Sequence, residues 1–381
     1  MPTNYEGTDM NIKKLIIAPD SFKGSMSSSE VADIIEQEAL RVFPECEIKK
    51  LPIADGGEGS LDAIVFLTGG EKRSTTVISP DGSEIAAKYL ITDDGRAILE
   101  LAESSGFARQ QGLHPMTSST YGFGQLILDA LNFGAKSFTL CIGGSATTDG
   151  GCGMAAALGV RFLDKNGKSF CPCGKTLMDI VEIDLSKIDE RIRECTFTVM
   201  CDVENPLFGE NGAAYRYAPQ KGANEEQTCV LDEGLRLLGG LLHKLLNKDV
   251  SHIVGGGAAG GLRAGCVAFL DAKLTSGIEA MLNLCDFNAL VKDADAIITG
   301  EGKLDEQSLM GKVLSGIIKA SNGLQIISIC GVNKCDKEAL LKSNIVAFET
   351  SEGITAQESL SRPTYYLQKA SSRAVSYLKN K

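Results

Sequence analysis

The residues best suited to bind a ligand lie in a glycine- and hydroxyl-rich segment, 143–151, near the middle of the chain. An apolar run of strand-forming residues, 137–142, precedes it, and a helix-forming run, 154–158, follows it. A loop that leads from a strand into a helix presents free backbone N–H groups, and glycine lets a ligand approach the backbone closely. Such a loop is typical of a phosphate site, although a tight turn without a ligand has a similar composition. The residues that we predict to contact the phosphates are Gly143, Gly144, Ser145, Thr147, Gly150 and Gly151.

Acidic, hydroxyl and lysine side chains follow four other predicted strands, at the carboxyl ends where ligands bind in open α/β sheets. Carboxylates there can hold Mg²⁺ or orient a substrate hydroxyl, and a lysine can neutralise a phosphoryl group or a carboxylate. The same residue types also cap turns, which is their commoner use. The candidates are Asp20, Ser21 and Lys23 after strand 14–18, Asp55 and Glu58 after strand 48–53, Asp202 and Asn205 after strand 195–200, and Asp305 after strand 296–299.

Two further segments are candidates for binding a nucleotide or an anion. Residues 255–261 lack side-chain bulk, so Gly257 and its neighbours could admit an adenine ring or a phosphate, or could form a hinge or a close packing contact. Lys221 could hold an anion or lie on the surface. The P-loop motif G-x-x-x-x-G-K-[ST] and the serine-hydrolase motif G-x-S-x-G are both absent from the sequence. Residues 151–156 match only the loose dinucleotide-binding pattern G-x-G-x-x-A.

The order of predicted elements indicates how these loops are positioned. Strands and helices alternate at both ends of the chain, and Ser27 with Glu30 has the spacing of a helix capping box. The middle differs, because the strand-like runs 75–79, 85–92 and 97–103 are separated by turn signals, which predicts a mixed sheet.

We therefore predict an α/β protein of two domains. Residues 1–72 and 291–381 form a Rossmann-like domain with a doubly wound parallel sheet, in which residues 1–11 are an extension before the first strand. A large inserted α/β domain with a mixed sheet, residues 73–290, interrupts it and carries the glycine-rich loops.

Composition excludes several classes of partner. The 381 residues carry a formal net charge of −11, which argues against binding to nucleic acid or an anionic membrane surface. No apolar run is long enough for a transmembrane helix, and the polar N-terminus does not have the pattern of a signal peptide. Twelve cysteines without a regular framework indicate reduced thiols and a cytoplasmic location, and three histidines argue against a structural zinc site.

Several strand ends thus share glycine, acids, hydroxyls and an occasional lysine, which is what phosphoryl transfer to a small molecule requires. These residues also resemble the type I bacterial glycerate kinases, from about Lys13 to the last helix. The sequence differs from the usual family pattern at two positions: Thr148 stands where Asn is common, and Gln125 stands where the family more usually has Glu. The resemblance rests on segments 17–23, 54–59, 142–151, 201–206, 219–223, 257–261 and 299–302.

The resemblance implies ATP-dependent phosphorylation of D-glycerate with Mg²⁺, in an active site between two α/β domains. We predict 2-phosphoglycerate as the product, and a homodimer is compatible with the sequence. Within these loops we assign catalysis to Asp202, Lys23 and Asp20, with Asp202 as the first choice for the base. The 143–151 loop and Gly257 would bind ATP, and Asp149 and Asp305 would bind the metal. Substrate would contact Ser21, Asp55, Glu58, Asn205 and Lys221.

Two other classes of function remain open on the sequence. A non-catalytic sensor or binding protein could use the same loops to hold an acidic metabolite, although no output domain is apparent. An oxidoreductase with a nucleotide cofactor would depend only on the loose match at 151–156.

Overall fold

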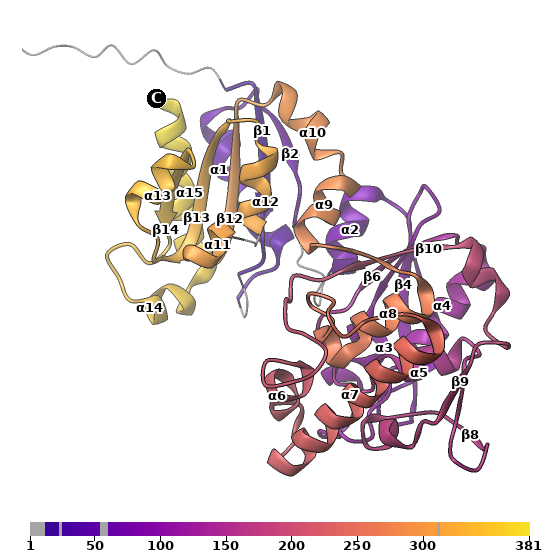
Figure 1. Ribbon diagram of the computed structural model, residues 1–381. Coiled ribbons are helices and arrows are strands. Elements are labelled where there is room, and N and C mark those ends of the chain that lie inside the picture. Colours follow the sequence, from indigo (N-terminus) through magenta and orange to yellow (C-terminus); the bar gives the residue numbers. More distant parts are fainter. Residues whose placement is uncertain (1–11, 23–24, 54–59, 311–312) are drawn as a thin grey trace, which may run out of the picture. The chain divides into compact units, whose positions relative to one another are not determined.

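The computed structural model describes residues 12–22, 25–53, 60–310 and 313–381 (Figure 1). Packing divides the described chain into two compact units. Unit 1 comprises the residues up to 53 together with Asp62–Thr68 and Gly277–Lys381, and unit 2 comprises residues 60–61 and Gly69–Ser276. The domain boundaries predicted from the sequence lie between residues 72 and 73 and between residues 290 and 291. Packing assigns residues 277–290 to unit 1, where Ile278 lies against Gly316.

The sheet of unit 1 is parallel throughout, with the strand order β14-β13-β12-β1-β2. Numbered in chain order within this unit, the strands follow the doubly wound order 2-1-3-4-5. The order reverses between β1 and β12, and ligands bind outside the carboxyl ends of strands at such a switch point. The strands are β1 Lys14–Pro19, β2 Glu47–Lys50, β12 Ala296–Leu304, β13 Gln325–Asn333 and β14 Ile345–Glu349.

Helices α1 and α15 form one core with this sheet (Figure 1). Strand residues such as Ile17 and Ile298 alternate with residues of the opposite face, so one face packs against Val31 of α1 and Ala374 of α15. The capping box predicted at Ser27 is confirmed, since its hydroxyl accepts from the Glu30 N–H and the Glu30 carboxylate accepts from the Ser27 N–H. The helices are α1 Ser28–Val42, α9 Gly277–Leu284, α10 Phe287–Leu290, α11 Glu306–Met310, α12 Val313–Ala320, α13 Lys337–Lys342, α14 Ala356–Ser361 and α15 Pro363–Lys379; α2, Ser60–Thr68, has residues in both units.

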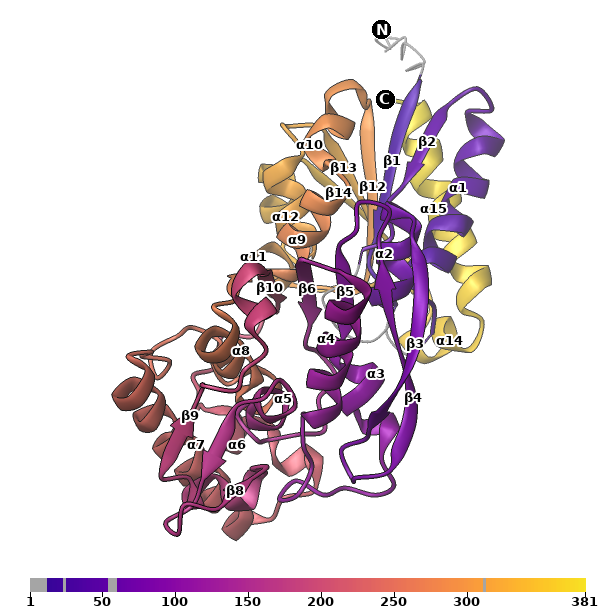
Figure 2. The ribbon, with the colours of Figure 1, turned by 90° about the vertical axis from the view of Figure 1, so that its right-hand side faces the viewer.

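Unit 2 contains a six-stranded mixed sheet in the order β11-β10-β6-β5-β4-β3 (Figure 2). Hairpin strands β3 and β4 are antiparallel, as are β4 and β5, whereas β5, β6, β10 and β11 run parallel. The mixed sheet predicted for the middle of the chain is therefore confirmed. The strands are β3 Glu71–Ile78, β4 Glu84–Ile91, β5 Ala97–Glu100, β6 Ser137–Cys141, β10 Thr196–Met200 and β11 Lys273–Thr275; β7 Arg161–Leu163, β8 Ser169–Phe170 and β9 Glu182–Asp184 form a separate small sheet.

Helices α4 and α8 share an apolar core with the six-stranded sheet, in which Phe138 and Phe197 stack with centroids 4.7 Å apart. A second core joins α5, α7 and α8 to the small sheet. The prediction of a strand over 97–103 is wrong beyond Glu100, because the chain turns into α3 there. The helices of unit 2 are α3 Leu101–Ser105, α4 Tyr121–Phe133, α5 Cys152–Ala157, α6 Ala213–Tyr217, α7 Glu225–Leu246 and α8 Leu262–Leu270.

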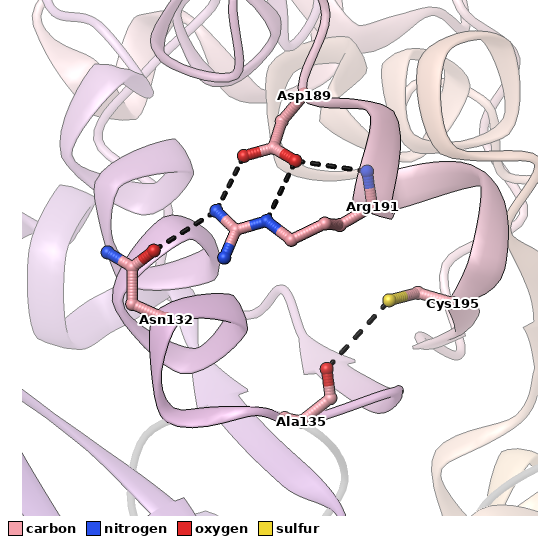
Figure 3. Close-up of polar contacts among 5 residues, drawn as sticks. All are labelled: Asn132, Ala135, Asp189, Arg191 and Cys195. Atoms are coloured by element: carbon pink, nitrogen blue, oxygen red, sulfur yellow. Dashed lines mark hydrogen bonds and ion pairs between the residues drawn. The ribbon is translucent and has the colours of Figure 1, made fainter.

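Polar contacts fasten the segment before β10 to the end of α4 (Figure 3). Asp189 accepts two bonds from the Arg191 guanidinium, at 2.6 and 2.9 Å, and Arg191 also donates to Asn132 at 3.0 Å. The Cys195 thiol lies 3.8 Å from the Ala135 carbonyl. These contacts hold the start of β10 beside the start of β6 and so support the register of the strands that carry the candidate site. Within the described ranges, no helix is long and apolar enough to cross a membrane.

Candidate functional site

The first group of predicted site residues lies at the switch point of unit 1. Asp20 follows β1, and its N–H donates to the Gly300 carbonyl of β12 at 2.8 Å. The Asp20 carboxylate accepts from the Ser21 N–H at 2.6 Å, so a hydrogen bond joins these two predicted residues. Both are partly exposed at the carboxyl edge of the sheet, where a ligand can reach them.

Asp305 lies beyond the end of β12, in a small polar network. Its carboxylate pairs with Lys303 at 2.7 Å and accepts from the Ser308 N–H at 3.3 Å, at the start of α11. The Ser308 hydroxyl in turn donates to Glu301 at 2.7 Å. These contacts favour a role for Asp305 in capping the helix over the metal-binding role predicted above. The predicted residues Lys23, Asp55 and Glu58 lie outside the described residues.

Asp149 is the centre of the 143–151 loop, which we call the first glycine segment. Its side chain is fully buried, and its carboxylate accepts from Thr120, through both N–H and hydroxyl, at 2.7 and 2.8 Å. It also accepts from the N–H groups of Gly151 and Gly153 at 3.1 and 3.2 Å. Burial raises the pKa of Asp149, and these bonds oppose that shift. The contacts favour a role in fixing the loop over the predicted role as a metal ligand.

Lys221 reaches the same loop from the short helix after α6. Only 2% of the residue is exposed, and its ammonium donates to the Thr147 carbonyl and, at 3.5 Å, to the Ser145 hydroxyl. Desolvation lowers the pKa of Lys221 to about 7, and the charge of Asp149 acts in the opposite direction. Lys221 therefore holds the first glycine segment from within, and this burial does not favour the predicted contact with substrate.

Four backbone N–H groups of the first glycine segment are already used within the protein. Ala146 donates to the Ser105 carbonyl at 3.0 Å, and Thr147 donates to the Ser145 hydroxyl at 3.1 Å. Gly150 donates to the Gly260 carbonyl at 3.0 Å, and Gly151 donates to Asp149. Gly143 is partly exposed and Gly144 is exposed, whereas residues 145–151 are buried. Of the residues predicted to contact phosphate, Gly143 and Gly144 are thus the ones that a ligand can reach directly.

Residues 255–261, the second glycine segment, pack against the first. A Cβ on Gly260 would lie 2.1 Å from the Thr147 carbonyl oxygen, so the two backbones are in direct contact. Gly257 donates to the Asn205 carbonyl at 2.9 Å, and a Cβ there would lie 2.2 Å from the Pro206 carbonyl oxygen. Of the alternatives left open for Gly257, the structure favours close backbone packing over nucleotide binding.

The segment after β10 carries Asp202 on the surface of unit 2. Strands β6 and β10 are parallel and end in register at Cys141 and Met200, so Gly143–Gly144 and Asp202 emerge at the same edge of the sheet. Asn205 is engaged within the protein, because its amide donates to the Asn211 carbonyl at 2.8 Å and accepts from the Tyr217 hydroxyl at 2.5 Å.

Two residues of this site were missed in the sequence. Thr120 anchors Asp149 from a position 29 residues away, and nothing in its local sequence distinguishes it. Arg263 donates to the Val203 carbonyl at 3.0 Å, next to Asp202. Its position two residues after the second glycine segment, in the first turn of α8, was a signal that could have identified it.

Among the residues that the structure describes, a metal would have few protein ligands. Within the described residues, no group of three or more His, Cys, Asp or Glu side chains is placed to hold an ion. Magnesium bound with a nucleotide takes most of its oxygen ligands from phosphates and water, with one or two carboxylates from the protein. The described residues are compatible with that mode and do not form a dedicated metal cage.

The comparisons with known proteins give one consistent result. The model of the "Glycerate kinase family" matches residues 15–379. The chain is 44% identical to a glycerate kinase from Halalkalibacterium halodurans, over 87% of this chain and 89% of the relative. It is 41% identical to a glycerate 2-kinase from Escherichia coli, over 84% and 85% of the two chains. A crystal structure assigned as glycerate kinase 2 from Salmonella typhimurium superimposes with a TM-score of 0.84 at 35% identity, and covers 97% of this chain and 99% of that one.

Proposed function

Because this chain belongs to the glycerate kinase family, we propose that it transfers the γ-phosphoryl group of ATP to D-glycerate, with Mg²⁺, and forms 2-phosphoglycerate. The observation that supports this most directly is the shared edge of β6 and β10. It presents accessible glycines of a phosphate-type loop, Gly143 and Gly144, beside an exposed carboxylate, Asp202. Those are the two kinds of group that a phosphoryl transfer from a nucleotide to a hydroxyl requires.

In the proposed reaction, Asp202 accepts the proton of the glycerate hydroxyl as the oxygen attacks the γ-phosphorus. The bond from that phosphorus to the bridging oxygen breaks, and ADP leaves. The backbone at Gly143 and Gly144 lies against the phosphates, and the buried contacts of Asp149 and Lys221 keep it in place. Magnesium, when bound, neutralises the phosphate oxygens, and Asp20 of unit 1 is the protein carboxylate that we propose for that ion or for the substrate.

The proposal assigns roles to Asp20 and Ser21, which follow β1, and to Asp202, which follows β10. We further propose that the enzyme works in the cytoplasm, which is supported by the twelve cysteines forming no disulfide with one another.

A coupled assay that follows ADP formation tests the activity, with D-glycerate and ATP present and Mg²⁺ added or chelated. We expect turnover that needs all three components. Phosphorus NMR of the product separates 2-phosphoglycerate from 3-phosphoglycerate. Tight glycerate binding without ADP formation would contradict the proposal and favour a binding protein.

Asp202→Asn tests the proposed base. We expect kcat to fall by about 100-fold or more, because an amide cannot accept the proton. The melting temperature should change little, because the side chain lies on the surface. The matched control is Glu204→Gln, which removes an exposed carboxylate two residues away and should leave kcat within about twofold. Near-normal turnover of Asp202→Asn would exclude Asp202 as the base.

A further inference from the structure

Arg263 is a buried arginine, and no carboxylate among the described residues pairs with its guanidinium group. We propose that its guanidinium binds the carboxylate of the acid substrate, beside the group that takes the proton from the hydroxyl. This inference rests on the proposed function and adds to it the residue that recognises the acid.

The environment of Arg263 is unusual for an arginine. Only 8% of the residue is exposed, yet within the described ranges it forms no ion pair. Its one side-chain hydrogen bond there runs from Nη1 to the Val203 carbonyl at 3.0 Å, and its buried Nε has no partner. A guanidinium has five N–H donors and is charged at any physiological pH, so most of its hydrogen-bonding capacity is unused.

The surrounding backbone is built to accept this side chain. Gly255 has a φ of +74°, and a Cβ at that position would lie 2.1 Å from both Nη1 of Arg263 and the Val203 carbonyl oxygen. Any other residue at 255 would therefore displace the guanidinium. The Gly255 N–H also donates to the Glu204 carbonyl at 3.0 Å, which holds the second glycine segment against the segment that carries Asp202. Burying an unpaired charge is unfavourable unless a ligand compensates it.

The position of Arg263 indicates which anion it binds. Its hydrogen-bond acceptor, Val203, directly follows Asp202, the proposed base. In a 2-hydroxy acid the carboxylate is attached to the carbon that bears the hydroxyl, so the groups that bind the two must be neighbours in the protein. Arginine matches the two oxygens of a carboxylate with paired donors. Lys221, the other buried basic residue that the structure describes near these loops, already donates to Thr147 and Ser145.

A terminal phosphate of the nucleotide has similar chemistry, and steady-state kinetics distinguishes the two anions. We would compare wild-type protein with Arg263→Met and Arg263→Lys, and measure KM for D-glycerate at saturating ATP and KM for ATP at saturating D-glycerate. For Arg263→Met we expect KM for D-glycerate to rise by about ten- to hundredfold, as for a lost charged hydrogen bond. KM for ATP should stay within about twofold. The control is Arg161→Met, which removes a half-exposed arginine of the small sheet and should change neither value.

A neutral analogue and chemical rescue separate binding of the carboxylate from support of the Val203 segment. D-Glyceramide lacks the negative charge, so the preference of the wild-type enzyme for D-glycerate over D-glyceramide should largely disappear in Arg263→Met. Added guanidinium ion should restore part of the D-glycerate activity of Arg263→Ala, and Arg263→Lys should be intermediate.

Three results would overturn the inference: an increase confined to KM for ATP, an equal loss with D-glycerate and D-glyceramide, or unchanged kinetics in Arg263→Met. If Arg263→Met does not fold, the folded Arg263→Lys variant gives the same comparison of the two substrates. The same assay measures turnover of D-glycerate by the wild-type protein. If only the inference is wrong, the wild-type protein still turns over D-glycerate; if the proposed function is wrong, it does not.

Discussion

At the scale of single residues, Lys221 is a predicted ligand-binding residue whose side chain contacts the first glycine segment. Its segment indicated an anion-binding lysine, but the ammonium is buried and donates to a carbonyl 74 residues away. The residues next to Lys221 in the sequence give no indication of a contact with a residue so far away along the chain. The same holds for Thr120, whose hydrogen bonds to Asp149 arise only when α4 and the first glycine segment pack together.

The burial of Lys221 predicts a pH-dependent stability. Its pKa is about 7 in the folded protein and about 10.4 in an unfolded chain, so the unfolded state binds more protons between these values. Its contribution to the free energy of unfolding therefore increases with pH from about 7 to about 10, by at most about 1.4 kcal/mol per pH unit. Lys221→Met removes this contribution.

Thermal unfolding of wild-type and Lys221→Met protein at pH 7, 8 and 9 checks this prediction. We expect the melting temperature of the wild type, relative to the variant, to rise across this series. Comparing the two proteins cancels the titration of the cysteines, which both share. A difference that is constant with pH would show that Lys221 keeps an ordinary pKa.

At the scale of elements, the two glycine segments pack directly against each other. Their composition is equally suited to binding phosphate and to close packing of backbones, so the sequence could not decide between these roles. Packing favours a structural role for Gly257 and Gly260, which face carbonyl oxygens, and leaves Gly144 exposed. Elements with a strong local signal were predicted well, as for the helix that begins after Ser27, whereas the boundary between β5 and α3 had no such signal.

Gly260→Ala tests this packing. The new Cβ would lie 2.1 Å from the Thr147 carbonyl oxygen at a φ of +67°, so both a clash and backbone strain follow. We expect a loss of about 3 kcal/mol in the free energy of unfolding. Gly82→Ala is the matched control, since its φ is +92° and nothing lies within 4 Å of the added Cβ; it should lose about 1 kcal/mol from strain alone. Equal losses in thermal melts of the two variants would contradict the packing argument.

At the scale of the whole molecule, the alternation of strands and helices at both chain ends predicted the parallel sheet of unit 1 before any contact was known. Strands β1 and β2 come from the start of the chain and β12, β13 and β14 from its end, and they form one sheet. The hairpin turns around β4 likewise predicted a mixed sheet in the middle. The small sheet of β7, β8 and β9 was missed, because strands of two or three residues have too little periodicity to detect.

The division of the cores predicts that unit 2 can fold by itself. Among the described residues, the core formed by β1, α1 and α15 and the two cores described for unit 2 have no residue in common, and residues 69–276 are continuous in sequence. We expect a 69–276 fragment to unfold cooperatively on heating, with the helix content of unit 2, and to show no turnover of D-glycerate because the unit 1 residues are absent.

A shorter fragment, 97–276, is the control for that experiment. It lacks β3 and β4, and so removes the fully buried Tyr89, whose ring packs in the core and whose hydroxyl donates to Asp129 of α4 at 2.7 Å. The loss of this side chain and of the strand that covers β5 should prevent cooperative folding. If 69–276 behaved like 97–276 and gave no cooperative transition, the core of unit 2 would depend on unit 1, and the two units would be one folding domain.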